Sequence, residues 1–172
     1  MELPIRKRTR LEKWDYSSPA TYFLTVCAKD RRPFFSRVVD CGITESAKVS
    51  LLPCGREIQN AIAFFAENNP EFRFDTWVIM PNHIHILLTL KQSPGGASGM
   101  MRPTSQVIPK LVSSLKRFTN RKCGRELWQN GYYDHIIRDE QDFLRIWQYI
   151  DTNPAKWLED KYYVIETMEV NL

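Results

Sequence analysis

The sequence predicts an α+β domain of the ferredoxin-like, split β-α-β type, with a four-stranded antiparallel sheet and helices on one face. Two observations lead to this prediction. Segments rich in β-branched and aromatic residues alternate with segments whose apolar residues recur at helical spacing, in the order strand, helix, strand, strand, helix, strand, helix. The first six elements match the split β-α-β topology, and a further C-terminal helix follows them.

The predicted strands are short segments of β-branched and aromatic residues bounded by turn residues. They cover residues 20–28, 72–80, 82–91 and 132–138. A turn at 30–33 follows the first strand, and a tight bend at Pro81-Asn82 joins the second to the third. Residues 34–53 are less regular, and we interpret them as a small irregular hairpin.

Three segments have the apolar spacing of amphipathic helices. The first runs from Gly55 to Glu67 and ends at Asn68-Asn69-Pro70. The second carries an apolar stripe made by Ile108, Leu111, Leu115 and Phe118. Asp139 can cap the third helix, and Pro154 ends it. We expect the apolar face of this third helix to consist of Phe143, Ile146, Trp147 and Ile150.

The 172 residues are enough for one domain with a real core, and we expect residues 1–172 to form it. A basic arm at 1–18 and a flexible glycine-rich loop at 92–101 are expected to lie outside the packed elements. The apolar runs are too short to span a membrane, and the N-terminus lacks the apolar core of a signal peptide. The four cysteines form no C-x-x-C pair, which favours reduced thiols in a cytoplasmic protein.

Basic residues are concentrated in two segments, although the net charge is only +4. Residues 102–125 contain seven Lys and Arg and no acidic residue, and residues 1–13 contain five basic and two acidic residues. This distribution favours a polyanion bound on one surface. A solvated helix face is the alternative, and it is the more common role of a basic segment.

Two of the three histidines lie two residues apart, as His83-Ile84-His85, in a segment that predicts a strand. Side chains at i and i+2 of a strand point to the same face, so the two imidazoles should project side by side. Such a pair could bind one divalent metal ion or act in acid–base chemistry. Two structural histidines are the alternative, but adjacent imidazoles on a core face would need two sets of partners. We expect His83 and His85 to share a site open to solvent.

Tyr149 lies away from the predicted apolar face of its helix, and Asn153 follows four residues later. Together they could supply a phenolic nucleophile and an amide-oxygen metal ligand. For each residue alone a structural role is more common: a partly exposed tyrosine, and an asparagine that caps the helix before proline. We expect His135, on the predicted fourth strand, to support the site indirectly at most.

These segments occur in an order that is typical of one protein family. They are Met80-Pro81-Asn82-His83-Ile84-His85, the helix with Lys116, residues 127–138, and Tyr149-Ile150-x-x-Asn153-Pro154. Over residues 20–157 the chain resembles the single-tyrosine HUH transposases, and in particular the REP-associated tyrosine transposases. It departs from that pattern in the long glycine-rich loop at 92–101, which bears on DNA contacts made by the loop and not on the site residues.

The resemblance implies a metal-dependent enzyme that cuts and joins single-stranded DNA, typically a hairpin from a repetitive palindrome. It implies that His83, His85 and Asn153 bind Mg²⁺ or Mn²⁺. It also implies that Tyr149 attacks a phosphodiester and keeps the 5′ phosphate as phosphotyrosine. Such enzymes occur as monomers and as homodimers. From the basic segment we expect DNA contacts by Lys110, Lys116, Arg117, Arg121 and Lys122.

Two other functions compete with this one. The first is a catalytically inactive, domesticated nucleic-acid-binding protein of the same fold. The second is a metal-dependent phosphoesterase in which water is the nucleophile. The presence of all four expected site residues favours the strand-transferring enzyme, and the single H-x-H without an accompanying Asp/Glu cluster disfavours the phosphoesterase.

Overall fold

A four-stranded antiparallel sheet forms the centre of the molecule in the computed structural model, which describes residues 14–40, 47–91 and 106–163. Its spatial order is β4-β5-β1-β6. The bounds are Ala20–Cys27 for β1, Phe72–Ile79 for β4, His83–Leu90 for β5 and Tyr133–Ile136 for β6. The loop expected at 92–101 and most of the arm expected at 1–18 lie outside the described residues.

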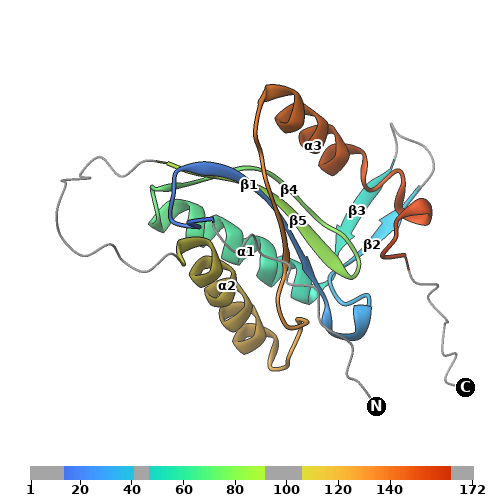
Figure 1. The fold of residues 1–172 in the computed structure, drawn as a ribbon. Helices are drawn as coiled ribbons and strands as arrows, with labels where there is room; N and C mark the ends of the chain where they lie inside the picture. Colours follow the sequence, from blue (N-terminus) through green and yellow to red (C-terminus); the bar gives the residue numbers. More distant parts are fainter. Residues whose placement is uncertain (1–13, 41–46, 92–105, 164–172) are drawn as a thin grey trace, which may run out of the picture.

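The helices lie on both faces of this sheet (Figure 1). Helices α1 (Pro53–Asn68) and α2 (Val107–Cys123) pack against each other on one face. Helix α3 (Glu140–Thr152) crosses the opposite face and is followed by the short 3₁₀ helix η2 (Trp157–Glu159). The predicted α+β class, the split β-α-β order and the additional C-terminal helix are confirmed.

The smaller elements agree with the sequence in kind and differ in detail. A separate antiparallel pair of short strands, β2 (Ser36–Val39) and β3 (Lys48–Leu51), forms the expected irregular hairpin. A 3₁₀ turn, η1 (Lys29–Arg31), follows β1 where a turn was expected. The fourth strand is shorter than predicted. The placement of Trp147 on the apolar face of α3 was wrong, because its side chain is 40% exposed at the edge of the helix.

Alternate residues of the central strands face two different cores, because successive side chains of a strand point to opposite faces. The larger core lies under α1 and α2 and receives residues such as Leu24 and Leu88. The smaller one lies under α3 and consists of Phe23, Leu87, Ile146 and Ile150. The same α3-facing rows of β1 and β5 also carry the polar residues Thr25, His83 and His85.

No helix in the described parts of the chain is both long enough and apolar enough to cross a bilayer. The cysteines whose state the structure gives, Cys27, Cys54 and Cys123, are free thiols.

Candidate active site

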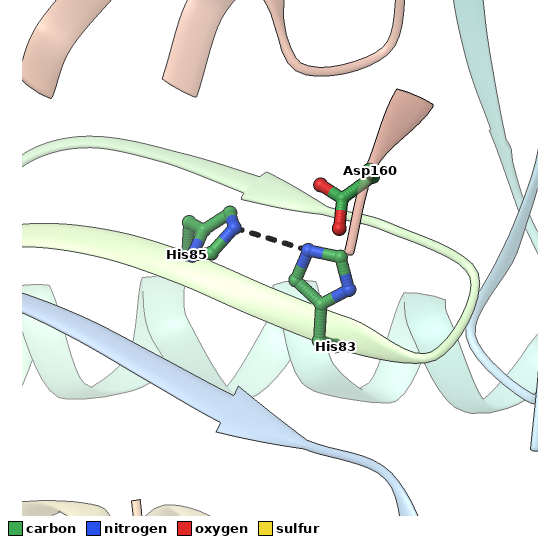
Figure 2. A group of neighbouring side chains, drawn as sticks. All are labelled: His83, His85 and Asp160. Atoms are coloured by element: carbon green, nitrogen blue, oxygen red, sulfur yellow. Dashed lines mark hydrogen bonds between the residues drawn. The ribbon is translucent and has the colours of Figure 1, made fainter. Parts of the chain in front are cut away.

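His83 and His85 lie side by side on the α3 side of β5, with their Nε2 atoms 3.0 Å apart (Figure 2). The shared face follows from their i, i+2 spacing on a strand. Their expected exposure was wrong, however, since the two residues are only 0% and 1% exposed. Tyr162, in the chain beyond α3, packs against the ring of His83, while a cleft still reaches His85 from the surface.

Each imidazole has a fixed orientation because its Nδ1 atom has a partner on a neighbouring strand or turn. Asn82 donates through Nδ2 to the carbonyls of Arg31 (3.1 Å) and Tyr162 (2.7 Å), so its Oδ1 faces His83. This oxygen accepts from Nδ1 of His83 at 3.0 Å, which leaves a lone pair on the opposite nitrogen, Nε2. Nδ1 of His85 lies 2.9 Å from the hydroxyl of Thr25, which orients the second ring. Partners of this kind hold histidines in metal sites.

Both histidines are neutral at physiological pH. Burial, with smaller contributions from the charges of Lys161 and Arg31, lowers the pKa of His83 from 6.5 to about 3. Burial also holds the pKa of His85 well below its usual value, and the neighbouring His83 and Lys161 act in the same direction. The neutral form is the form that ligates a metal, so the pair is ready to bind one without losing a proton.

A carboxylate that the sequence did not single out completes the group. Asp160 follows η2, and its carboxylate lies over the two imidazoles (Figure 2). One ligand atom from each of His83, His85 and Asp160 lies within 4.8 Å of the others. The segment after Pro154 has no clear periodicity, so its only sequence signal was an acidic residue among aromatic ones, Trp157, Tyr162 and Tyr163.

Asn153 lies just behind Asp160, at the end of α3. The residue is 3% exposed, and its Nδ2 donates to Oδ2 of Asp160 at 3.1 Å. Its Oδ1 is buried, and no donor from the described part of the chain reaches it. An acceptor left without a donor in a buried place is costly, and a cation would satisfy it. Two imidazoles, a carboxylate and this amide oxygen form a donor set that fits Mg²⁺ or Mn²⁺.

Tyr149 points from α3 toward the histidine pair. Its hydroxyl lies 3.3 Å from Nε2 of His85, and its ring packs edge-on against Phe23 and His85. The residue is 37% exposed, in agreement with its expected position off the apolar face. Burial and the charge of Asp160 raise its pKa, and a hydrogen bond with Asn153 acts in the opposite direction. Tyr149 is therefore a neutral phenol at physiological pH.

An open cleft with a volume of about 610 Å³ reaches Tyr149 and His85 from the surface. Its wall carries three cationic side chains that the sequence did not bring together: Arg145, Lys156 and Lys161. Tyr133, which is 50% exposed, lies on the same wall, with the Lys161 ammonium 6.0 Å from its ring centre. Cations beside an exposed aromatic ring are typical of surfaces that bind single-stranded nucleic acid.

His135 also lines this cleft, but its nearest partner is not a site residue. Its Nε2 lies 2.7 Å from Oδ2 of Asp142, which also forms an ion pair with Arg145. The arrangement links β6 to α3 beside Arg145. An indirect role for His135, through the position of Arg145, stays a prediction.

The basic residues of α2 lie on the other side of the sheet from the histidine pair (Figure 1). Four of the five expected DNA contacts there are exposed: Lys110, Arg117, Arg121 and Lys122. The fifth, Lys116, donates to the carbonyls of Gln129 (2.7 Å) and Gly131. Burial lowers its pKa to about 8. Lys116 therefore holds the loop before β6 against α2.

A sequence model of the family described as "Transposase IS200 like" matches residues 17–153, which include the histidine pair, Tyr149 and Asn153. The chain belongs to this family. Within the described residues, the match covers every strand and helix except η2, and it ends before Asp160.

Among the relatives of this IS200-like transposase is an uncharacterized protein of Haemophilus influenzae, 31% identical over 92% of this chain and 93% of the relative. The REP-associated tyrosine transposase of Escherichia coli is 29% identical over 58% of this chain and 53% of its own length. A solved structure of a REP-associated tyrosine transposase bound to a REP hairpin has 24% identity. It covers 80% of this chain and 67% of its own, with a TM-score of 0.54, and so shares the fold.

Transposases cleave DNA, so the family assigns this chain to DNA-cleaving enzymes. REP-associated tyrosine transposases are among its relatives, as the sequence motifs predicted. Among the described residues, His83, His85 and Asp160 form a cluster whose chemistry suits a metal ion, and Asp160 lies beyond the matched residues 17–153.

Proposed function

We propose that this chain is a metal-dependent endonuclease and strand transferase that acts on hairpin or palindromic-repeat DNA in single-stranded form. The observation that carries the proposal is the position of Tyr149, whose hydroxyl lies 3.3 Å from a buried, neutral histidine pair and faces an open cleft. The hairpin bound to the structural relative supports this class of substrate.

In this proposal Tyr149 is the nucleophile, and His83, His85 and Asn153 would hold Mg²⁺ or Mn²⁺. The Tyr149 oxygen forms a bond to the scissile phosphorus while the bond from phosphorus to the 3′ oxygen breaks. The phenol proton goes to solvent, and the departing 3′ oxygen takes a proton from water. When bound by these residues, the ion would supply positive charge that offsets the negative charge of the phosphate. The 5′ phosphate stays on Tyr149. When a 3′ hydroxyl later attacks this phosphate, the phosphodiester forms again and the bond from phosphorus to Tyr149 breaks.

DNA would be bound on two surfaces in this proposal. The cleft cations lie beside Tyr149 and suit the phosphates of the unpaired strand, while Tyr133 can stack on a base. The basic surface of α2 suits a more distant part of the substrate, such as a hairpin stem. It comprises Lys110, Lys116, Arg117, Arg121 and Lys122, with Lys116 acting through the loop that it holds. One chain holds the nucleophile and the ligands, so a monomer suffices and a homodimer is compatible. We also propose a cytoplasmic location.

The test is covalent capture of a labelled hairpin oligonucleotide. Wild-type protein with Mn²⁺ should give an adduct that survives SDS, and EDTA should prevent it. Tyr149→Phe removes only the hydroxyl and should abolish the adduct while hairpin binding persists. Tyr133→Phe, on the same cleft, is the matched control and should keep the adduct.

Three outcomes would contradict the proposal. Cleavage without any adduct would indicate water as the nucleophile, as in a phosphoesterase. Hairpin binding without cleavage under any divalent metal would indicate the inactive DNA-binding alternative. An adduct that persists in Tyr149→Phe would move the nucleophile to another tyrosine, and Tyr132 and Tyr133 would be the next residues to test.

A further inference from the structure

We propose that the Asp160 carboxylate is itself a ligand of the metal, alongside His83 and His85, and that Asn153 orients it. This inference rests on the proposed metal-dependent function. It adds a charged ligand to the three neutral ligands of the proposed function. The ligand comes from the segment after η2, beyond the part of the chain that the family model matches.

The first support is the position of the carboxylate. Its oxygen and one nitrogen of each imidazole lie within 4.8 Å of one another, and Figure 2 shows the carboxylate directed at the space beside the two rings. Ligands about 2.0–2.3 Å from a shared ion lie roughly 3–4.6 Å apart, depending on the angle between them. Asp160 therefore needs little or no movement to share an ion with the histidines.

The second support is that Asp160 is held in place by hydrogen bonds that leave ligand capacity. Oδ1 accepts from the backbone N–H of Tyr162 at 2.7 Å, and Oδ2 accepts from Nδ2 of Asn153 at 3.1 Å. Each carboxylate oxygen can accept more than one partner, so both retain a lone pair. Ligating carboxylates are commonly held by such outer hydrogen bonds. Asn153 can thus orient Asp160 through its NH₂ group while its own buried oxygen remains available.

The third support is electrostatic. Lys161 and Arg31 both lie close to the ring of Tyr162, which packs against His83, so both charges make the surroundings of the histidine pair unfavourable for added positive charge. A divalent cation bound only by neutral imidazole and amide atoms would be opposed by the same two charges. A carboxylate directly on the ion offsets them at the shortest distance, where Coulomb energies are largest. Carboxylate is also the side-chain ligand that Mg²⁺ and Mn²⁺ prefer.

The competing role for Asp160 is purely structural, as the residue that closes the turn at Tyr162. The variant Asp160→Asn separates the two roles, because it keeps an acceptor for the Tyr162 N–H and removes the charge, together with the second oxygen that accepts from Asn153. Glu159→Gln is the matched control, since it removes an exposed acid one residue away. Asp160→Glu keeps the charge and should partly restore what Asp160→Asn loses.

The measurement is calorimetric titration of the full chain with Mn²⁺ in the absence of DNA, with the melting temperature as a check of folding. Asp160→Asn should weaken Mn²⁺ binding at least about tenfold. Glu159→Gln should stay within about twofold of wild type. With Co²⁺ in place of Mn²⁺, the visible absorption bands should change in Asp160→Asn and not in Glu159→Gln, because loss of a ligand alters the coordination of the ion.

Asp160→Asn that binds Mn²⁺ as tightly as wild type, and with an unchanged Co²⁺ spectrum, would overturn the inference. If His83→Gln loses Mn²⁺ in the same series, the proposed function stands and Asp160 only closes the turn. If wild type forms the Tyr149 adduct but Mn²⁺ binding depends on none of these residues, the metal site itself is wrong.

Discussion

The two faces of the sheet carry different kinds of buried residue, although both are formed by the same strands. The face under α1 and α2 carries the larger apolar core, in which Thr119 and the Asp134 carboxylate, which accepts from Tyr16, are buried polar groups. The face under α3 has a small apolar cluster beside buried histidine, threonine and asparagine. Helices α3 and η2 cover polar groups that could bind a ligand. This face therefore has less apolar contact area than the other. The comparison indicates that stability and function are separated by strand alternation.

Adjacent residues of β5 allow the largest test of this comparison, since Leu87 and Leu88 are both fully buried and face opposite cores. Leu88→Ala should lower the free energy of unfolding by about 2–5 kcal/mol, because it leaves a cavity in the larger core. Its folded fraction should still form the DNA adduct. Leu87→Ala should cost less stability, because only one helix covers it, and should reduce adduct formation by displacing α3. Urea denaturation and adduct yield per folded molecule measure the two effects.

That separation would be broken if Leu88→Ala lost the adduct in fully folded protein while Leu87→Ala kept it.

The two cationic surfaces should differ in their effect on DNA. Changing Arg145, Lys156 and Lys161 together to glutamine should weaken binding of an unpaired strand and reduce adduct yield. The equivalent change of Lys110, Arg117 and Arg121 should weaken only hairpins with a stem. Removing one phosphate contact should lower the slope of log affinity against log salt by about 0.7 for a single strand and about 0.9 for a duplex. Fluorescence anisotropy over a salt series measures both slopes.

An unchanged slope in the second variant would show that α2 is only a solvated surface.

The buried histidine pair should also make the stability of the protein fall in acid. His83 has a pKa of about 3 when folded, against an ordinary value of 6.5. Below pH 6.5 the unfolded chain binds a proton at His83, whereas His83 of the folded chain stays neutral until the pH approaches 3. The contribution of His83 to the free energy of unfolding is therefore present above pH 6.5 and is lost as the pH falls toward 3. The melting temperature should therefore fall through this range. The melting temperature of His83→Gln should fall less steeply with pH. Equal slopes in the variant and the wild type would contradict the low pKa of His83.

The smallest expected difference is in stability, between variants that remove the hydroxyls of two tyrosines on opposite faces of the sheet. Tyr149→Phe should change the free energy of unfolding by less than about 1 kcal/mol, since the hydroxyl is partly exposed. Tyr22 faces the larger core, where its hydroxyl donates to the Ser18 carbonyl and accepts from Trp14. Tyr22→Phe should cost about 1–3 kcal/mol, because it removes both part-buried hydrogen bonds of the Tyr22 hydroxyl. Thermal denaturation of the two variants measures the difference, and a larger loss in Tyr149→Phe would reverse the order.

The sequence predicted the elements whose patterns are local. Segments of β-branched and aromatic residues bounded by turn residues located β1, β4 and β5. The period-two geometry of a strand put His83 and His85 on one face of β5. A helical stripe located α3, but the stripe alone could not tell Trp147 at its edge from Ile146 and Ile150 at its centre. The metal, nucleophile and DNA-contact roles of the named residues stay predictions.

Features that depend on distant segments were missed. The site was expected to be open, because nothing in the pattern of residues 155–172 indicated that Asp160 and Tyr162 return over the histidines. The α2 cations were noticed because they are close in sequence. The cleft cations Arg145, Lys156 and Lys161 come from α3 and from the segment around η2, so only the fold brings them together.

The short turn between β4 and β5 restricts which insertions and deletions the chain can accept at this point. It is closed by a hydrogen bond from the Met80 N–H to the carbonyl of His83, at 2.9 Å. Adding or deleting one residue between Ile79 and His83 would slip β5 by one position against its neighbours and turn both imidazoles into the apolar core. A two-residue change would preserve which face each side chain meets. Viable descendants of this sequence should therefore vary the length of this turn only in even steps.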